Sequence, residues 1–115
     1  MANILIVDDS ASMRQMIKFT LEIAGHKVTE ATDGAQGLGL AKKNGYDLVI
    51  SDVNMPNMNG IEMTTAIREL GTHKSMPILL LTTESGLDRK GEGKKAGATG
   101  WLVKPFDPEQ LTKIV

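Results

Sequence analysis

Five short apolar runs lie along the chain, separated by stretches in which apolar residues recur with helical periodicity. The runs predict strands over residues 3–8, 27–31, 47–52, 77–82 and 100–103. The first, third and fourth runs are continuously apolar rather than alternating, as is typical of parallel strands that are covered on both faces. The pattern therefore predicts a parallel sheet with helices on both of its faces.

The stretches between and after the strands predict five helices. Their expected ranges are 11–24, 34–43, 60–70, about 86–96, and a last one from about 108 to 115. The first is the most clearly amphipathic. Its apolar arc comprises Met13, Met16, Ile17, Leu21, Ile23 and Ala24. The fourth has little apolar anchoring, and the last is still building an apolar stripe at Val115, so we expect the last helix to be truncated.

Two of these helices carry further local signals. Asn59 and Glu62 form a capping-box pattern at the start of the helix over 60–70. Gly37 and Gly39 lie inside the helix over 34–43, where each glycine costs ~1 kcal/mol relative to alanine. The second helix must therefore rely on packing for its stability.

Strands that alternate with helices predict an α/β, doubly wound fold. The sequence has no repeat, low-complexity tract or linker, so residues 1–115 are interpreted as one domain. In an open parallel sheet, ligands bind beyond the carboxyl ends of the strands, at the point where the strand order reverses. The residues that follow each strand are therefore the candidates for chemistry.

Polar residues stand at these strand ends. Asp8 and Asp9 follow the first strand, Asp52 ends the third, Thr82 ends the fourth, and Lys104 follows the fifth. If the strand order is 2-1-3-4-5, the reversal lies between the first and third strands. The three aspartates would then converge at one edge of the sheet.

Three ionised carboxylates at one place would repel one another strongly. Two carboxylates ~4 Å apart repel by about 4 kcal/mol at an effective dielectric constant near 20. Either one group is protonated, with a raised pKa, or a cation lies among them. Oxygen ligands without nearby His or Cys favour a hard divalent ion, and Mg²⁺ fits best because it also accepts a phosphate oxygen. A carboxylate beside Mg²⁺ and a lysine is a suitable nucleophile for phosphoryl transfer.

Four stretches resemble the signature motifs of response-regulator receiver domains. They are ILIVDDS at 4–10, LVISDVNMPNMNG at 48–60, LLLTTES at 79–85 and GWLVKPF at 100–106. The resemblance covers essentially the whole chain, and it is greatest to the single-domain chemotaxis members of the family. It implies a flavodoxin-like, five-stranded parallel sheet of order 2-1-3-4-5 in a receiver domain that spans residues 1–115.

The resemblance also assigns the metal and phosphate site residue by residue. It implies that Asp52 is the phosphate acceptor and that Asp9 binds Mg²⁺ directly, while Asp8 usually acts through water. Asn54 matches the position whose backbone carbonyl completes the metal site.

Other matched positions imply a switch. Thr82 and Lys104 match the residues that contact the phosphoryl group, and Trp101 stands where the family has its switch aromatic. Phosphorylation would draw Thr82 inward and let Trp101 turn, which would change the face formed by the fourth helix, fifth strand and fifth helix. Glu84 lies where the family tunes hydrolysis and partner access.

The function that this resemblance implies is a phosphorylation switch with weak self-dephosphorylation, not an enzyme with an outside substrate. We expect a chemotaxis histidine kinase as donor and the flagellar motor switch as target, with a non-chemotaxis two-component pathway as the alternative. The net charge of −1 gives no general attraction to nucleic acid or membrane lipid. No apolar run is long enough to span a bilayer, and cysteine is absent, so we expect a cytoplasmic protein. We also expect it to be a monomer.

Three other functions share part of the pattern. A haloacid-dehalogenase-type phosphatase also uses an aspartyl nucleophile and Mg²⁺, but it needs a second aspartate where this chain has Asn54. In a flavodoxin-type binding module, Asp8 and Asp9 would repel the flavin phosphate. A degenerate receiver that only scaffolds partners is disfavoured by the full acidic set and Lys104.

Overall fold

The computed structural model describes residues 2–43, 45–53, 55, 57–70, 76–82, 94 and 96–103, with the backbone alone for Thr82 and residues 101–103. Strands and helices follow one another in the predicted order. Their bounds are β1 Asn3–Val7, α1 Ala11–Ile23, β2 Lys27–Ala31, α2 Gly34–Lys43, β3 Leu48–Asp52, α3 Gly60–Glu69, β4 Ile78–Thr82 and β5 Gly100–Val103. Most of the helix expected over 86–96, and all of the last helix, lie outside the described residues.

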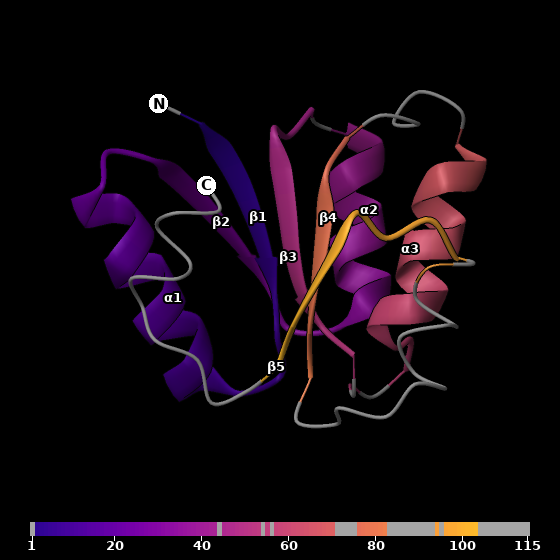
Figure 1. Ribbon diagram of the computed structural model, residues 1–115, viewed down its shortest axis with the longest axis horizontal. Helices are drawn as coiled ribbons and strands as arrows, with labels where there is room; N and C mark the ends of the chain where they lie inside the picture. Colours follow the sequence, from indigo (N-terminus) through magenta and orange to yellow (C-terminus); the bar gives the residue numbers. More distant parts are fainter. Residues whose placement is uncertain are drawn as a thin grey trace.

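The strands form one parallel sheet in the order β2-β1-β3-β4-β5, which confirms the predicted doubly wound α/β fold. Figure 1 shows α1 on one side of the sheet and α2 and α3 on the other. Strand pairing sets Val7 of β1 opposite Ser51 of β3. Asp8 and Asp52 therefore leave the sheet side by side, at the edge where the strand order reverses.

Alternate residues of the central strands supply an apolar core on each face of the sheet. On the α1 side, Ile4, Ile6 and Ile50 pack with Ile17 and Leu21. The core on the other side includes Leu5, Val7, Val49, Met63, Ile67 and Leu80. All of these side chains are fully buried. Burial of each contributes about 1.5–3 kcal/mol, so the two cores hold the sheet rigidly between its helices.

The apolar arc predicted for α1 is correct at Ile17 and Leu21 and wrong at its C-terminal end. Ile17 and Leu21 are fully buried, whereas Ile23 is 70% exposed and Ala24, which follows it, is also exposed. No helix in the part of the chain that the structure describes is long and apolar enough to cross a membrane.

Packing explains one of the two glycines inside α2. A Cβ at Gly37 would lie 2.8 Å from the Sδ atom of Met63 and 2.9 Å from the Cγ2 atom of Val7. At Gly39 a Cβ would meet nothing within 4 Å. Gly37 therefore lets α2 approach α3 and β1 closely, while Gly39 has no such role.

The start of β5 is fixed by contacts with α3 and β4. Arg68 donates from Nε and Nη2 to the carbonyl oxygen of Gly97, at 3.0 and 2.9 Å. The hydroxyl of Thr99 accepts a hydrogen bond from the Ile78 N–H at 3.1 Å. These contacts hold the edge strand in register, and β5 ends directly before Lys104.

Candidate functional site

The three aspartates that follow β1 and end β3 come together in the folded chain. One carboxylate oxygen from each of Asp8, Asp9 and Asp52 lies within 4.8 Å of the other two. Asp8 is 1% exposed and Asp52 is 8% exposed, whereas Asp9 faces solvent. The site is therefore a pair of buried carboxylates with a third at the mouth.

Local hydrogen bonds orient the carboxylate of Asp8. Its Oδ1 accepts from the backbone N–H of Ser10 at 2.9 Å, while its own N–H donates to the Ala31 carbonyl at 3.1 Å. Arg14 donates from Nη1 to the Asp8 carbonyl at 2.7 Å and also pairs with Glu30, with Nε and Oε1 3.4 Å apart. The turn after β1 is thus fixed from both of its sides.

The end of β3 is held just as closely. Oδ1 of Asp52 accepts from the Val53 N–H at 2.9 Å, and the Ser51 hydroxyl donates to the Asp52 carbonyl at 2.8 Å. The N–H of Gly60 donates to the Val53 carbonyl at 3.0 Å. A Cβ at Gly60 would overlap the Asp52 carbonyl oxygen, so this contact needs glycine. Thr64 then donates to the Gly60 carbonyl at 2.7 Å.

The donor set of the site fits a hard divalent cation. All three candidate ligands are carboxylates. Oxygens that bind one Mg²⁺ at about 2.1 Å lie roughly 3–4 Å apart, so small side-chain movements or a bridging water would complete the sphere. Asp8, Asp9 and Asp52 would hold Mg²⁺ here, and its charge would offset the repulsion among them.

The remaining predicted site residues are placed only in part. Thr82 ends β4, one residue after the Leu81 that pairs with Asp52, so its backbone reaches the same edge of the sheet. Trp101 in β5 pairs with Leu80 in β4. The side chains of Thr82 and Trp101 lie outside the described residues, as do all atoms of Asn54, Glu84 and Lys104.

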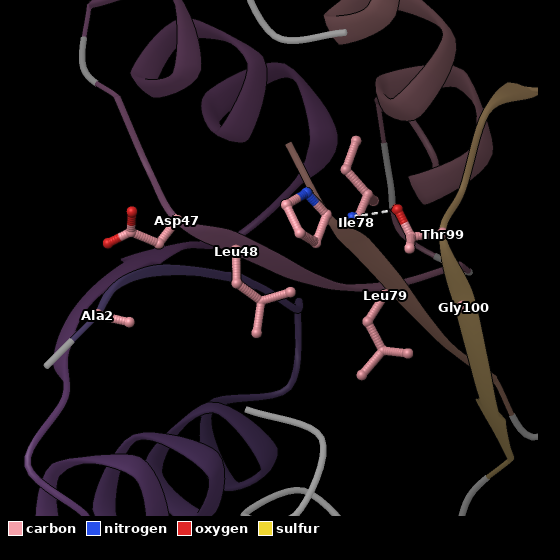
Figure 2. A pocket seen from close by; sticks show the side chains of 8 residues that line it. Ala2, Asp47, Leu48, Ile78, Leu79, Thr99 and Gly100 are labelled. Atoms are coloured by element: carbon pink, nitrogen blue, oxygen red, sulfur yellow. Dashed lines mark hydrogen bonds between the residues drawn. The ribbon is translucent and has the colours of Figure 1, made fainter. Parts of the chain in front are cut away.

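A cavity of about 380 Å³ lies at the opposite edge of the sheet, where β1, β3, β4 and β5 begin (Figure 2). Its lining comprises Ala2, Asp47, Leu48, Pro77, Ile78, Leu79, Thr99 and Gly100. Among the described residues that line it, Asp47 is the one that carries a charge, and its Oδ2 accepts from the Asn3 N–H at 2.8 Å. Three carboxylates converge at the acidic edge, whereas the described lining of this cavity supplies one, so the acidic edge is the better candidate for chemistry.

Two residues near the acidic edge, Asn57 and Asp33, were not predicted from the sequence to take part in the site. Asn57 has a backbone φ of 67°, and its side chain donates to Asp33 at the start of α2. The signal for Asn57 was available locally, because asparagine after proline favours a turn that tolerates this conformation. Its partner is 24 residues away in the sequence, and only the fold reveals it.

Comparison with known proteins places the chain in a family. The profile described as "Response regulator receiver domain" matches residues 4–115. A chemotaxis protein CheY homolog of Campylobacter jejuni is 42% identical over 110 residues, which cover 94% of this chain and 85% of that protein. The transcriptional regulatory protein SrrA of Staphylococcus aureus is 37% identical over 108 residues, which cover 94% of this chain and 44% of that protein.

Solved structures agree with this placement. The chemotaxis response regulator CheY4 of Vibrio cholerae is 54% identical, with a TM-score of 0.94 over 99% of this chain and 95% of that one. The receiver domain of the sensor histidine kinase PA1611 from Pseudomonas aeruginosa is 29% identical, with a TM-score of 0.91 over 98% of this chain and 93% of that one. In that structure a magnesium ion is coordinated in the active site cleft. The chain therefore belongs to the family of response regulator receiver domains, and its fold is that of CheY-like receivers.

Proposed function

We propose that this receiver domain is a phosphorylation switch in which Asp52 accepts a phosphoryl group from a phosphohistidine of a sensor kinase. The observation that carries the proposal is the convergence of Asp8, Asp9 and Asp52 within 4.8 Å. Asp9, Asp52 and the backbone carbonyl of Asn54 would hold Mg²⁺, with Asp8 acting through water.

The chemistry follows from the oriented carboxylate of Asp52. Its Oδ1 is held by the Val53 N–H, which fixes the plane of the nucleophile. A carboxylate oxygen forms the new O–P bond while the P–N bond of phosphohistidine breaks, and the leaving imidazole takes up a proton. Bound Mg²⁺ would neutralise charge on the carboxylates and on the phosphoryl oxygens. Lys104 and the Thr82 hydroxyl would contact the transferred group.

The same site would return the switch to its resting state. Water attacks phosphorus, the acyl phosphate bond breaks, and inorganic phosphate leaves a free carboxylate on Asp52. The chain therefore has weak self-dephosphorylating activity and no outside substrate, and Glu84 matches the position at which the family tunes this hydrolysis and partner access. When Asp52 is phosphorylated, Thr82 moves inward and Trp101 turns, which alters the surface around β5.

The pathway proposed for this switch is chemotaxis, with a chemotaxis histidine kinase as donor and the flagellar motor switch as target. The similarity to the Campylobacter and Vibrio chemotaxis proteins supports it. The similarity to SrrA, of which this chain matches 44%, supports the alternative of another two-component pathway. We propose a cytoplasmic monomer in either case. The rate of phosphate transfer to this chain, measured with a purified chemotaxis histidine kinase and with a purified kinase of another two-component pathway, would distinguish the two pathways.

Mass spectrometry after incubation with acetyl phosphate and Mg²⁺ tests the phosphate acceptor. We expect one added phosphoryl group on Asp52, and none in Asp52→Asn or when EDTA removes the metal. The variant Asp47→Asn makes the same change at the opposite edge of the sheet and should be phosphorylated like the wild type. An adduct that persists in Asp52→Asn would overturn the assignment.

A further inference from the structure

The connection between β3 and α3 is tied to the start of α2 by a side-chain bridge. Nδ2 of Asn57 donates to Oδ2 of Asp33 at 2.8 Å. Asn57 has a φ of 67°, in the left-handed region that asparagine tolerates better than most residues. The bridge therefore holds a turn whose backbone conformation is already unusual.

Asp33 uses its two carboxylate oxygens for different purposes. Oδ1 accepts from the Gln36 N–H at 2.8 Å and so caps the first turn of α2, while Oδ2 receives Asn57. The hydrogen bond from Gln36, followed by that from Asn57, lowers the pKa of Asp33 below its ordinary value. Both contacts thus favour the ionised carboxylate.

A backbone contact lies beside this bridge. The N–H of Gly34 donates to the Met58 carbonyl at 3.0 Å, and a Cβ at Gly34 would overlap that same oxygen. Figure 1 shows α2 and α3 side by side on one face of the sheet. The first turn of α2 therefore rests directly on residues 57–58.

This segment belongs to the loop that carries the proposed site. The loop leaves Asp52, passes the position of Asn54, and closes where the Gly60 N–H meets the Val53 carbonyl at 3.0 Å. Gly60 and Val53 hold the two ends of the loop, and Asp33 and Gly34 contact its residues Asn57 and Met58. Residues that orient a metal ligand without themselves binding the metal commonly influence the metal affinity of the site.

We propose that Asp33 and Asn57 are positioning residues for the metal and phosphate site. Their bridge holds the loop after Asp52 in the arrangement that binds Mg²⁺ and accepts phosphate, although neither residue touches the reacting atoms. This inference rests on the proposed function and deepens it, because it makes the start of α2 part of the site's support.

Two variants remove the bridge from opposite ends. Asn57→Gly deletes the side chain and keeps a residue suited to positive φ, whereas Asp33→Ser keeps a helix-capping hydroxyl but offers no second oxygen to Asn57. We expect each to weaken Mg²⁺ binding by about tenfold, measured by calorimetric titration of the full chain. The double variant should be no weaker than either single one, because both remove the same interaction.

The matched control is Asp47→Ser, which removes one exposed carboxylate hydrogen bond, to the Asn3 N–H, at the far edge of the sheet. It should leave the Mg²⁺ dissociation constant unchanged. Thermal unfolding in EDTA measures how much each variant destabilises the metal-free protein. If Asn57→Gly and Asp33→Ser lose more Mg²⁺ affinity than Asp47→Ser while their thermal midpoints are similar to its midpoint, a positioning role is supported.

The two proposals fail in different ways. If the wild type binds Mg²⁺ and takes phosphate from acetyl phosphate while Asn57→Gly and Asp33→Ser bind Mg²⁺ equally well, the positioning role is wrong and the switch stands. Additive losses of affinity in the double variant would also overturn the bridge. A wild type that binds no Mg²⁺ and accepts no phosphate would overturn both proposals.

Discussion

Asp8, Asp9 and Asp52 set the electrostatics of the site at the scale of single residues. With oxygens within 4.8 Å, each ionised pair repels by about 3.5 kcal/mol at an effective dielectric constant of 20. The backbone N–H groups of Ser10 and Val53 donate to two of the carboxylates and offset part of this cost. The residue types that suit the proposed chemistry therefore destabilise the metal-free fold.

Removing one of these charges should stabilise the metal-free protein. We expect Asp9→Asn and Asp52→Asn to raise the free energy of unfolding by roughly 1–3 kcal/mol, with the smaller gain for Asp9 because solvent screens its exposed charge. Urea denaturation in EDTA measures the change, and Asp47→Asn should show no gain. A lower unfolding midpoint in both site variants would mean that repulsion does not govern this edge.

At the scale of elements, α2 shows why a glycine inside a helix needs its surroundings to be interpreted. Gly37 allows close approach to Met63 and Val7, while a Cβ at Gly39 would meet open space. Both glycines carry the same intrinsic helix penalty. They differ only in what lies next to them in the fold, so α2 contains one glycine required by packing and one that packing does not require.

The two glycines should respond oppositely to the same substitution. Gly39→Ala should stabilise the protein by about 0.5–1 kcal/mol, since alanine is the better helix former and nothing opposes its methyl group. Gly37→Ala should destabilise it by about 1–3 kcal/mol, because the methyl group would overpack against Met63 and Val7. Urea denaturation compares the two directly. Equal shifts of the same sign would mean that α2 is not packed as described.

At the scale of the whole molecule, strand order brings the separate contributions together. β1 and β3 are neighbours in the sheet although β2 lies between them in the sequence, and their register sets Val7 opposite Ser51. A shift of one residue would turn the strand's side chains to the other face and separate Asp8 from Asp52. The two apolar cores that fix this register therefore also fix the acidic site.

Because the site exists only in the folded chain, Mg²⁺ should stabilise the fold. Binding to the native state alone adds about 2.7 kcal/mol at a concentration one hundred times the dissociation constant. We expect the thermal midpoint of the wild type to rise with Mg²⁺, and that of Asp9→Asn to rise far less. Asp47→Asn should respond like the wild type. An identical response in Asp9→Asn would place the bound metal elsewhere.

Much of this molecule could be predicted from the order of its residues. The eight strands and helices with described bounds lie within one residue of their expected ends, since periodicity and capping are local properties. The capping box of Asn59 and Glu62 is confirmed. The exposure of Ile23 was missed, because a helical pattern shows which residues share an arc and not how far a neighbour covers it.

By itself, the sequence determined that Asp8, Asp9 and Asp52 stand at strand ends, and it left their convergence conditional on a strand order that only the family resemblance implied. The tertiary structure decided that they meet, that Gly37 is needed where Gly39 is not, and that Asn57 reaches Asp33. The physical reason is range. Periodicity and caps act over one or two turns, whereas these contacts depend on how strands and helices far apart in the chain pair and pack.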